Sequence, residues 1–322
     1  MFAGTKLARY GDVIAEKTGL GRIWIGLALL AFITSLPELV TGVSAAVLVK
    51  IPDLAVGTLL GSCLFNITIL VILDVLNRKS PVLSKASPRH MISAGVGIVL
   101  IVIAGGSILA GERFSDLSLG WIGIPSFIIL LLYLTGMWGI FKYERRQSRS
   151  IMQTAHQYGK DAERRVYLKF VMAAMAVIGA GIWLAFIGDD LAAITGWGNT
   201  FIGSLFLAVS TSMPELVICI TAFRIGAIDL AVADVLGANM INIAKIFVVD
   251  LFYTQGSFLA EASGENLITA VTAITMSLVV IIGLKFRQKR KTFIVSSWYG
   301  PLLLMLHVSG AYLLFTSGTG TG

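Results

Sequence analysis

Long apolar stretches dominate this chain and limit what it can fold into. Crossing a hydrocarbon core of about 30 Å takes about 20 helical residues. Nine stretches are long enough: 22–48, 53–76, 91–110, 119–141, 167–187, 200–222, 227–250, 267–285 and 294–316. Only 13% of the residues are charged, whereas soluble domains carry about 25%. We therefore predict an all-α polytopic membrane protein.

The Lys and Arg residues collect in three gaps between these stretches. Residues 77–90, 142–165 and 285–291 contain 16 of the 25 Lys and Arg residues, and 253–266 contains none. With residues 1–16 counted as a tenth, incomplete crossing, all three basic gaps lie on one side, which the positive-inside rule makes cytoplasmic. We therefore predict a multi-pass protein of the cell (inner) membrane, in contact with lipids. The net charge of +7 does not indicate nucleic-acid binding, because most of the basic residues lie in these short gaps between apolar stretches.

An internal repeat relates the two halves of the chain. An offset of 177 residues carries residues 34–40, TSLPELV, onto residues 211–217, TSMPELV. An offset of 176 residues carries Asp53 onto Asp229 and Asn66 onto Asn242. With five crossings in each half, an odd number, the second half must enter the membrane from the opposite side. We predict two inverted repeats, 1–141 and 166–322, joined by a basic cytoplasmic loop at 142–165.

The first crossing is shorter than its counterpart. The stretch 167–187 has a partner only in residues 1–16, which also lack the apolar core of a signal peptide. The first helix is therefore expected to be truncated here or to begin further upstream.

A proline and a glutamate lie in the middle of one apolar helix of each half. An ionised carboxylate at mid-membrane costs at least about 2.5–3.5 kcal/mol, so such residues usually face a cavity or a partner. Pro37 and Pro214 cannot donate a backbone hydrogen bond, which frees carbonyl oxygens four residues earlier. With the hydroxyls of Thr34, Ser35, Thr211 and Ser212, Glu38 and Glu215 form an all-oxygen environment suited to hard cations such as Ca²⁺ or Na⁺.

The following helix of each half supplies a second polar set. It reads GSCLFN from Gly61 in the first half and GANMIN from Gly237 in the second. Cys63 and Asn66, like Asn239 and Asn242, lie three residues apart and share a helix face. Asn66 and Asn242 either bind the cation or only connect helices.

These paired segments resemble the two α-repeats of the calcium/cation antiporter superfamily, the sodium/calcium exchanger-like proteins. That family's motif is Gly-Thr-Ser-Leu-Pro-Glu followed by Gly-Ser-Asn/Asp-x-x-Asn, once in each half. The resemblance covers nearly the whole chain and implies the exchanger fold of ten helices in two inverted sets of five. It also implies that Glu38 and Glu215 are the central ligands, that the four hydroxyl residues assist them, and that Cys63 and Asn239 occupy the remaining ligand positions.

The chain departs from the family pattern at those last two positions. Calcium exchangers commonly carry Asn or Asp at the first and Asp at the second, whereas this chain has Cys63 and Asn239. Thiols are poor ligands for hard cations. Lys245, inside a crossing, is expected to extend outward rather than lie near the site. Asp234 replaces a residue that is often Asn, and lies either near the cytoplasmic mouth or at a solvated interface.

The resemblance implies a cation antiporter that exchanges Ca²⁺ for Na⁺ or H⁺ by alternating access and needs no cofactor. One alternative is an antiporter of altered selectivity, for a monovalent cation and protons or for another divalent cation. An intramembrane enzyme is disfavoured, because His90, His156 and His307 do not converge on a nucleophile. A non-transporting scaffold would not explain the retained glutamates.

Overall fold

The computed structural model describes residues 24–77, 80–111, 118–148, 190–293 and 296–319, with isolated helical positions between 172 and 187. The predicted segment 1–16, most of 167–187 and most of the basic loop 142–165 lie outside the described residues. Within the described part, seven helices are long and apolar enough to cross a membrane. A bent pair of helices, Asn199–Thr211 and Met213–Arg224, passes the same test when taken together and brings the number to eight if it is one broken span. The prediction of a polytopic helical membrane protein is confirmed.

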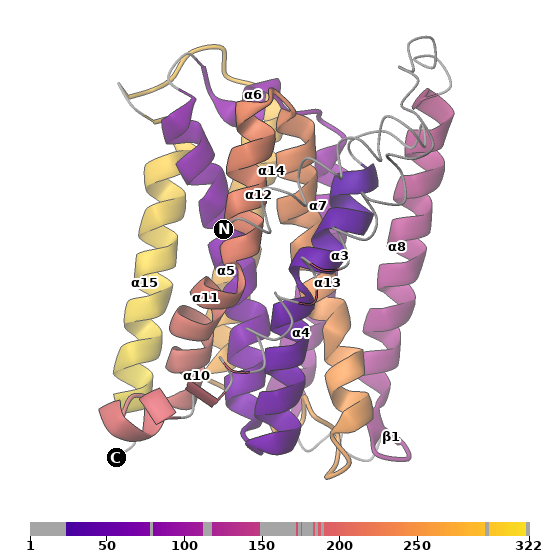
Figure 1. Cartoon of the computed structure of the whole chain (residues 1–322), viewed down its shortest axis with the longest axis vertical. Coiled ribbons are helices and arrows are strands. Elements are labelled where there is room, and N and C mark those ends of the chain that lie inside the picture. Colours follow the sequence, from indigo (N-terminus) through magenta and orange to yellow (C-terminus); the bar gives the residue numbers. More distant parts are fainter. Residues whose placement is uncertain are drawn as a thin grey trace.

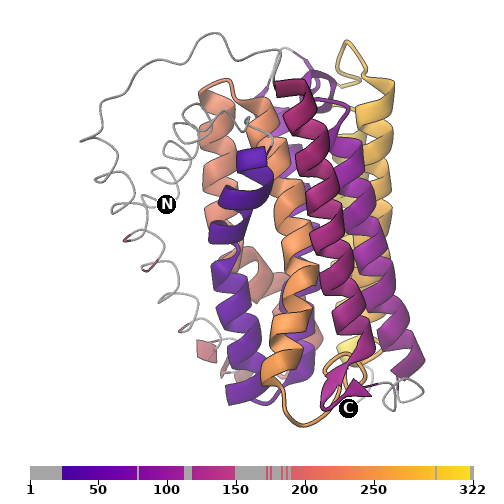
Figure 2. The same ribbon diagram turned by 90° about the vertical axis from the view of Figure 1, so that its right-hand side faces the viewer.

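The helices run between two ends of the molecule (Figures 1 and 2). In the first half they are η1 (Ile25–Leu30), α3 (Ala31–Thr34), α4 (Leu36–Val43), η2 (Ser44–Leu48), α5 (Pro52–Leu76), α6 (Val82–Lys85), α7 (His90–Ala110) and α8 (Ile124–Ser148). In the second they are α10 (Asn199–Phe201), η4 (Ile202–Leu207), α11 (Ala208–Thr211), α12 (Met213–Arg224), α13 (Ile228–Phe252), α14 (Asn266–Phe286) and α15 (Tyr299–Thr319). Helix α8 packs against α7 and α13, and α15 packs against α14 and α5.

Two predicted spans begin later than the apolar stretches that contain them. Residues 119–123 belong to a short hairpin of β1 (Ser118–Leu119) and β2 (Ile122–Gly123), which turns at Gly120 with φ of +71°. Helix α8 therefore starts at Ile124 rather than at residue 119. The last helix starts at Tyr299 rather than at residue 294, and just before it the Ser297 backbone N–H donates to the Asp74 carboxylate.

Two matched hydrogen-bond sets show that the halves cross in opposite senses. Asp53, at the start of α5, accepts from the Ser263 backbone N–H (2.6 Å) and from Asn266 (2.8 Å). Asp229, at the start of α13, accepts from the Ser87 backbone N–H (2.7 Å) and shares a hydrogen bond with the His90 ring (3.0 Å). The first Pro-Glu helix therefore ends beside the 253–266 loop, and the second ends beside the 80–90 loop. We call the end with residues 80–90 and 287–291 the basic face, and the end with 118–123 and 253–265 the opposite face; α6 and β1 mark them in Figure 1.

The two halves also touch through backbone-to-backbone contacts at glycines. A side chain on Gly61 of α5 would meet the backbone of Ser204 in η4. At the matched position, a side chain on Gly237 of α13 would meet the Leu27 backbone in η1. Small residues of this kind allow membrane helices to approach closely. They hold the second helix of each half against the Pro-Glu helix of the other half.

Two buried aspartates connect loops to helix ends at opposite faces. Asp74 accepts hydrogen bonds from the Val82 N–H (2.9 Å), the Ser297 N–H (2.7 Å) and the Tyr299 hydroxyl (2.5 Å). Asp250 accepts from the Phe258 N–H (2.8 Å), the Gly123 N–H (3.0 Å) and the Ser126 hydroxyl (2.5 Å). Each carboxylate receives donors from both halves, which satisfies its buried oxygens.

Candidate cation site

Both Pro-Glu helices are interrupted just before the proline. In the first half α3 ends at Thr34 and α4 begins at Leu36, and in the second α11 ends at Thr211 and α12 begins at Met213. The two parts of the second helix are bent by 43°. Proline fits the first turn of a helix, where its missing N–H is not needed, but disrupts a helix interior. The proline in each motif therefore causes a helix break at Ser35 and at Ser212, three residues before each glutamate.

The two glutamates lie in the interior with few partners. Glu38 and Glu215 are both 0% exposed. Glu38 Oε1 accepts a hydrogen bond of 2.9 Å from the Ser212 hydroxyl, which links the Pro-Glu motifs of the two halves. The other Glu38 oxygen and both Glu215 oxygens have no partner among the described residues. Buried polar atoms are nearly always bonded, so these three oxygens are suited to a ligand.

The neighbouring hydroxyls donate to their own helices. Thr34 donates to the Leu30 carbonyl at 3.0 Å, Ser35 to the Ala31 carbonyl at 2.5 Å, and Thr211 to the Leu207 carbonyl at 2.9 Å. A hydroxyl that donates its one proton still has lone pairs with which to accept or to bind a cation. The predicted hydroxyl oxygens are thus buried and chemically available.

The helices that follow the Pro-Glu helices are joined by their amides. The Asn66 amide donates to Asn239 Oδ1 at 3.1 Å, and the Asn239 amide donates to the Cys63 carbonyl at 3.2 Å. Asn66 therefore connects α5 to α13, one of its two predicted roles, while its own Oδ1 has no partner in the described part of the chain. The amide N–H of Asn239 is occupied by its bond to Cys63, so Asn239 could bind a cation only through its Oδ1 atom.

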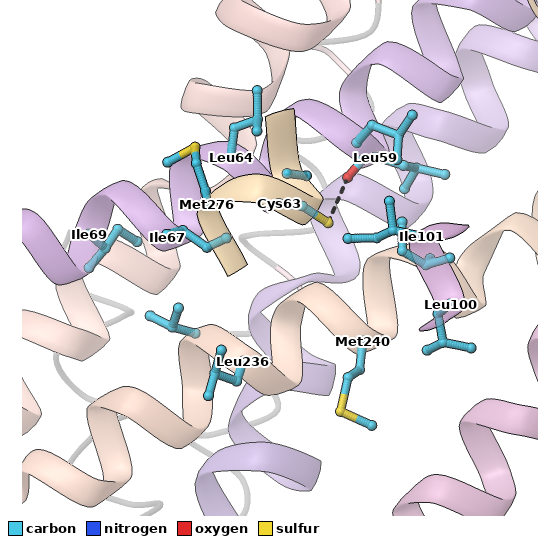
Figure 3. Packing of buried hydrophobic residues seen from close by; sticks show 14 of the residues in the cluster. Leu59, Cys63, Leu64, Ile67, Ile69, Leu100, Ile101, Leu236, Met240 and Met276 are labelled. Carbon is cyan, nitrogen blue, oxygen red and sulfur yellow. Dashed lines mark hydrogen bonds between the residues drawn. The ribbon is translucent and has the colours of Figure 1, made fainter. Parts of the chain in front are cut away.

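Cys63 is buried between apolar side chains and the polar groups of the candidate site, since Asn242, Lys245 and Glu38 all act on its thiol. Its thiol is directed toward the Leu59 carbonyl at 3.4 Å, with Leu64, Ile67 and Met240 nearby (Figure 3). The Asn239 carbonyl lies 3.8 Å from the same sulfur. This environment suits a neutral thiol rather than a ligand for a hard cation.

The prediction that Lys245 extends outward is wrong. Its side chain is 5% exposed, and its ammonium group donates to Asn242 Oδ1 at 2.8 Å. Because Asn242 is itself 0% exposed, this bond draws the ammonium group into the interior. A built-in positive charge therefore lies at the candidate site.

Asp234 and Ser62 extend the set chosen from the sequence. Asp234 is 0% exposed, so the solvated-interface alternative for this residue is wrong. Ser62 is not among the predicted ligand residues, yet its buried hydroxyl has no partner among the residues described. Its place in the Gly-Ser-Cys segment was the signal that pointed to it. Within the described residues, no three His, Cys, Asp or Glu side chains converge as they would at a resident metal centre.

Comparison with known proteins identifies the chain's family. The model of the family described as sodium/calcium exchanger protein matches residues 1–142 and 166–316. The chain belongs to the sodium/calcium exchanger family. Membership makes it an integral membrane cation antiporter rather than an enzyme, as the resemblance implied.

Individual relatives of this exchanger-family chain cover most of its length. The inner membrane protein YrbG of Escherichia coli (strain K12) is 26% identical over 80% of this chain and 77% of its own length. The putative antiporter CaxA of Alkalimonas amylolytica is 26% identical over 94% of this chain and 91% of its own. A solved structure of the sodium-calcium exchanger NCX_Mj matches with a TM-score of 0.69 at 17% identity, covering 97% of this chain and 93% of that one. This likeness confirms the predicted exchanger fold of inverted repeats.

Proposed function

We propose that this antiporter exchanges Ca²⁺ for Na⁺ or H⁺ by alternating access at a site between the two Pro-Glu helices. Glu38 and Glu215 are the central ligands in this proposal. Thr34, Ser35, Thr211 and Ser212 assist with hydroxyl oxygens, and Asn66, Asn239 and Asn242 with amide oxygens. Cys63, whose sulfur is a poor ligand for a hard cation, contributes only its position beside Asn239.

The observation that carries the proposal is the pair of buried glutamates at matched positions of the repeat. Three of their four oxygens have no hydrogen-bond partner in the described residues, and the fourth accepts from the other half's Ser212. A carboxylate held in this way in the membrane interior is costly unless a cation or proton neutralises it.

The cost of burying unneutralised carboxylates explains why transport of one cation is coupled to transport of the other. An empty site whose buried carboxylates outnumber its one ammonium group is costly to seal from water, whereas Ca²⁺, two Na⁺ or two protons offset that negative charge. Only the loaded forms then switch sides readily, by movement of one helix group against the other around a fixed site. We expect two monovalent ions for each Ca²⁺ and no net charge movement. A large transport current in reconstituted vesicles would contradict this stoichiometry.

Altered selectivity is the second candidate, and the buried ammonium group of Lys245 favours it. One positive charge beside two carboxylates leaves less negative charge to hold a divalent ion. In this alternative the chain exchanges a monovalent cation for protons, or carries another divalent cation. Competition by other cations against Ca²⁺ uptake separates the two candidates.

We also infer the orientation and division of the chain. The basic face lies in the cytoplasm, because short loops rich in Lys and Arg stay on that side. The membrane is the cell (inner) membrane, and the repeats are residues 1–141 and 166–322 around the loop 142–165. Labelling of single cysteines at Ser84 and Ser118 from each side of sealed vesicles tests this orientation.

The deciding experiment is ⁴⁵Ca²⁺ uptake into proteoliposomes under an imposed Na⁺ gradient and then an H⁺ gradient. Glu38→Gln and Glu215→Gln each remove one negative charge with little change of shape, and each should abolish uptake. Glu265→Gln, at the opposite face and partly exposed, is the matched control and should transport normally. Absence of uptake by folded wild-type protein under both gradients would overturn Ca²⁺ exchange and leave altered selectivity.

A further inference from the structure

Asp234 is a buried carboxylate that the exchange mechanism above does not use. It lies on α13, 0% exposed, between the basic face and Asn239. Its Oδ1 has no partner among the described residues, and the one donor to its Oδ2 is the Cys219 thiol at 3.6 Å. A thiol is a weak hydrogen-bond donor, so this carboxylate is poorly satisfied.

The structural aspartates of the same protein provide the comparison. Asp74 and Asp250 are also buried, yet each accepts from backbone N–H groups and hydroxyls at 3.0 Å or less. Asp53 and Asp229, at the helix starts, are bonded just as closely. A carboxylate that served only to hold the fold would be expected to look like these four. Asp234 has none of their donors, which points to a ligand.

The contact with Cys219 gives the direction of the Asp234 side chain. Cys219 follows Glu215 by four residues on α12, so the two share a helix face, about one turn or 5.4 Å apart. The Asp234 carboxyl group is therefore directed toward the strip of α12 that carries Glu215. Glu215 and Asp234 are both 0% exposed on neighbouring helices, so their like charges would repel each other. A cation between them would relieve that repulsion.

The arrangement occurs in one half only. The residues that match Cys219 and Asp234 in the first half are Gly42 and Thr58. Thr58 carries no charge and donates its hydroxyl to the Leu54 carbonyl at 2.7 Å. Asp234 also does not join Glu38 and Glu215 in one compact centre, since no three acidic groups converge among the described residues. It lies on the side of Glu215 that faces the basic end of α12.

We propose that Asp234 and Glu215 form a second cation subsite, which holds the transported ion between the central site and the basic face. The ligand is a hard cation, Ca²⁺ or Na⁺, bound by carboxylate oxygens rather than by the Cys219 sulfur. The proposal rests on the exchange function above. Because the opposite half has Thr58 in place of the acid, the ion meets this subsite only on the route to the basic face.

Sided transport tests the subsite. The concentration of Ca²⁺ that gives half-maximal transport is measured separately from each face, in vesicles of known protein orientation. Asp234→Asn should raise this concentration about tenfold at the basic face, the equivalent of one charge-assisted contact of about 1.4 kcal/mol. At the opposite face it should change less than twofold. Asp234→Glu should restore most of the affinity, and Cys219→Ala, which keeps the carboxylate, should leave it unchanged.

Ca²⁺-dependent thermal stabilisation in detergent supplies a readout that needs no transport. Asp234→Asn should reduce the stabilisation that Ca²⁺ gives to wild type, and Thr58→Val, at the matched position, should not. If Asp234→Asn does not fold, Asp234→Ser, which also lacks the charge, is measured from both faces instead, and a loss of affinity that is equal on both faces, or no loss at all, overturns the subsite. Wild-type uptake with an unaffected Asp234→Asn variant also overturns the subsite and leaves the exchange function standing. If Ca²⁺ is neither taken up through the wild-type protein nor stabilises it, both the subsite and the exchange function are overturned.

Discussion

The two halves of this protein use the same framework contacts but carry different charges along their second helices. Asp53 and Asp229 bind matching loop positions at opposite faces, through Asn266 in one case and His90 in the other. Gly61 and Gly237 lie against matching backbone segments of the other half. The helix-to-helix framework has therefore kept its two-fold relation.

The interior of the same two helices has lost that relation. Asp234 and Lys245 of α13 correspond to Thr58 and Ile69 of α5, and Asn239 corresponds to Cys63. Asp234 and Lys245 are both buried and would carry opposite charges, and neither has a charged counterpart at the matched position of α5. Symmetry is thus retained where the backbones touch and lost among the buried polar residues of α5 and α13.

Breaking the shared framework should have the largest effect. Gly61→Ala places a methyl group against the Ser204 backbone, which cannot rotate away, so we expect a loss of about 3 kcal/mol in the free energy of unfolding. Thermal unfolding followed by tryptophan fluorescence measures it. Gly106→Ala, on an exposed part of α7 with nothing within 4 Å of the new carbon, is the matched control and should be as stable as wild type. Equal stability of the two variants would contradict the close approach of α5 and η4.

Removing the charge found only in the second half should have the next largest effect. Lys245→Met keeps an unbranched side chain but deletes the ammonium group near Glu38 and Glu215, and should tighten Ca²⁺ binding about tenfold. Titration of Ca²⁺-dependent transport measures this affinity. Ile69→Met, at the matched position of α5, adds no charge and should not change it. An unchanged affinity in Lys245→Met would remove this residue from the electrostatics of the site.

Making the two halves more alike should have the smallest effect. His90→Asn gives the second-half aspartate, Asp229, the same partner that Asn266 provides to Asp53, and we expect a loss below about 1 kcal/mol. His90→Ala removes the partner and should cost about 1–2 kcal/mol. Thermal unfolding of both variants, with Asn266→His as the reciprocal exchange, measures the difference. If His90→Asn were as damaging as His90→Ala, the two connections would not be equivalent.

The sequence by itself determined the architecture of this protein. Runs of about 20 apolar residues leave few alternatives to membrane helices, and an odd number of crossings in each repeat requires opposite senses. The duplicated Pro-Glu segments also singled out Glu38 and Glu215. Proline breaks a helix and an ionised glutamate is costly in a membrane, and both effects hold regardless of how the neighbouring helices pack. These inferences depend on local chemistry and on counting.

The tertiary structure alone decided which polar side chains share the interior. Helices α5 and α13 are apolar on nearly all sides, so their sequences carry no amphipathic pattern that marks an inward face. Lys245 has a long stem that reaches either lipid headgroups or Asn242, and only the packing of α13 settled the choice. Asp234 was ambiguous for the same reason until its neighbour was known to be Cys219 of α12. The direction of a side chain depends on helices distant in sequence, which a single stretch of residues does not encode.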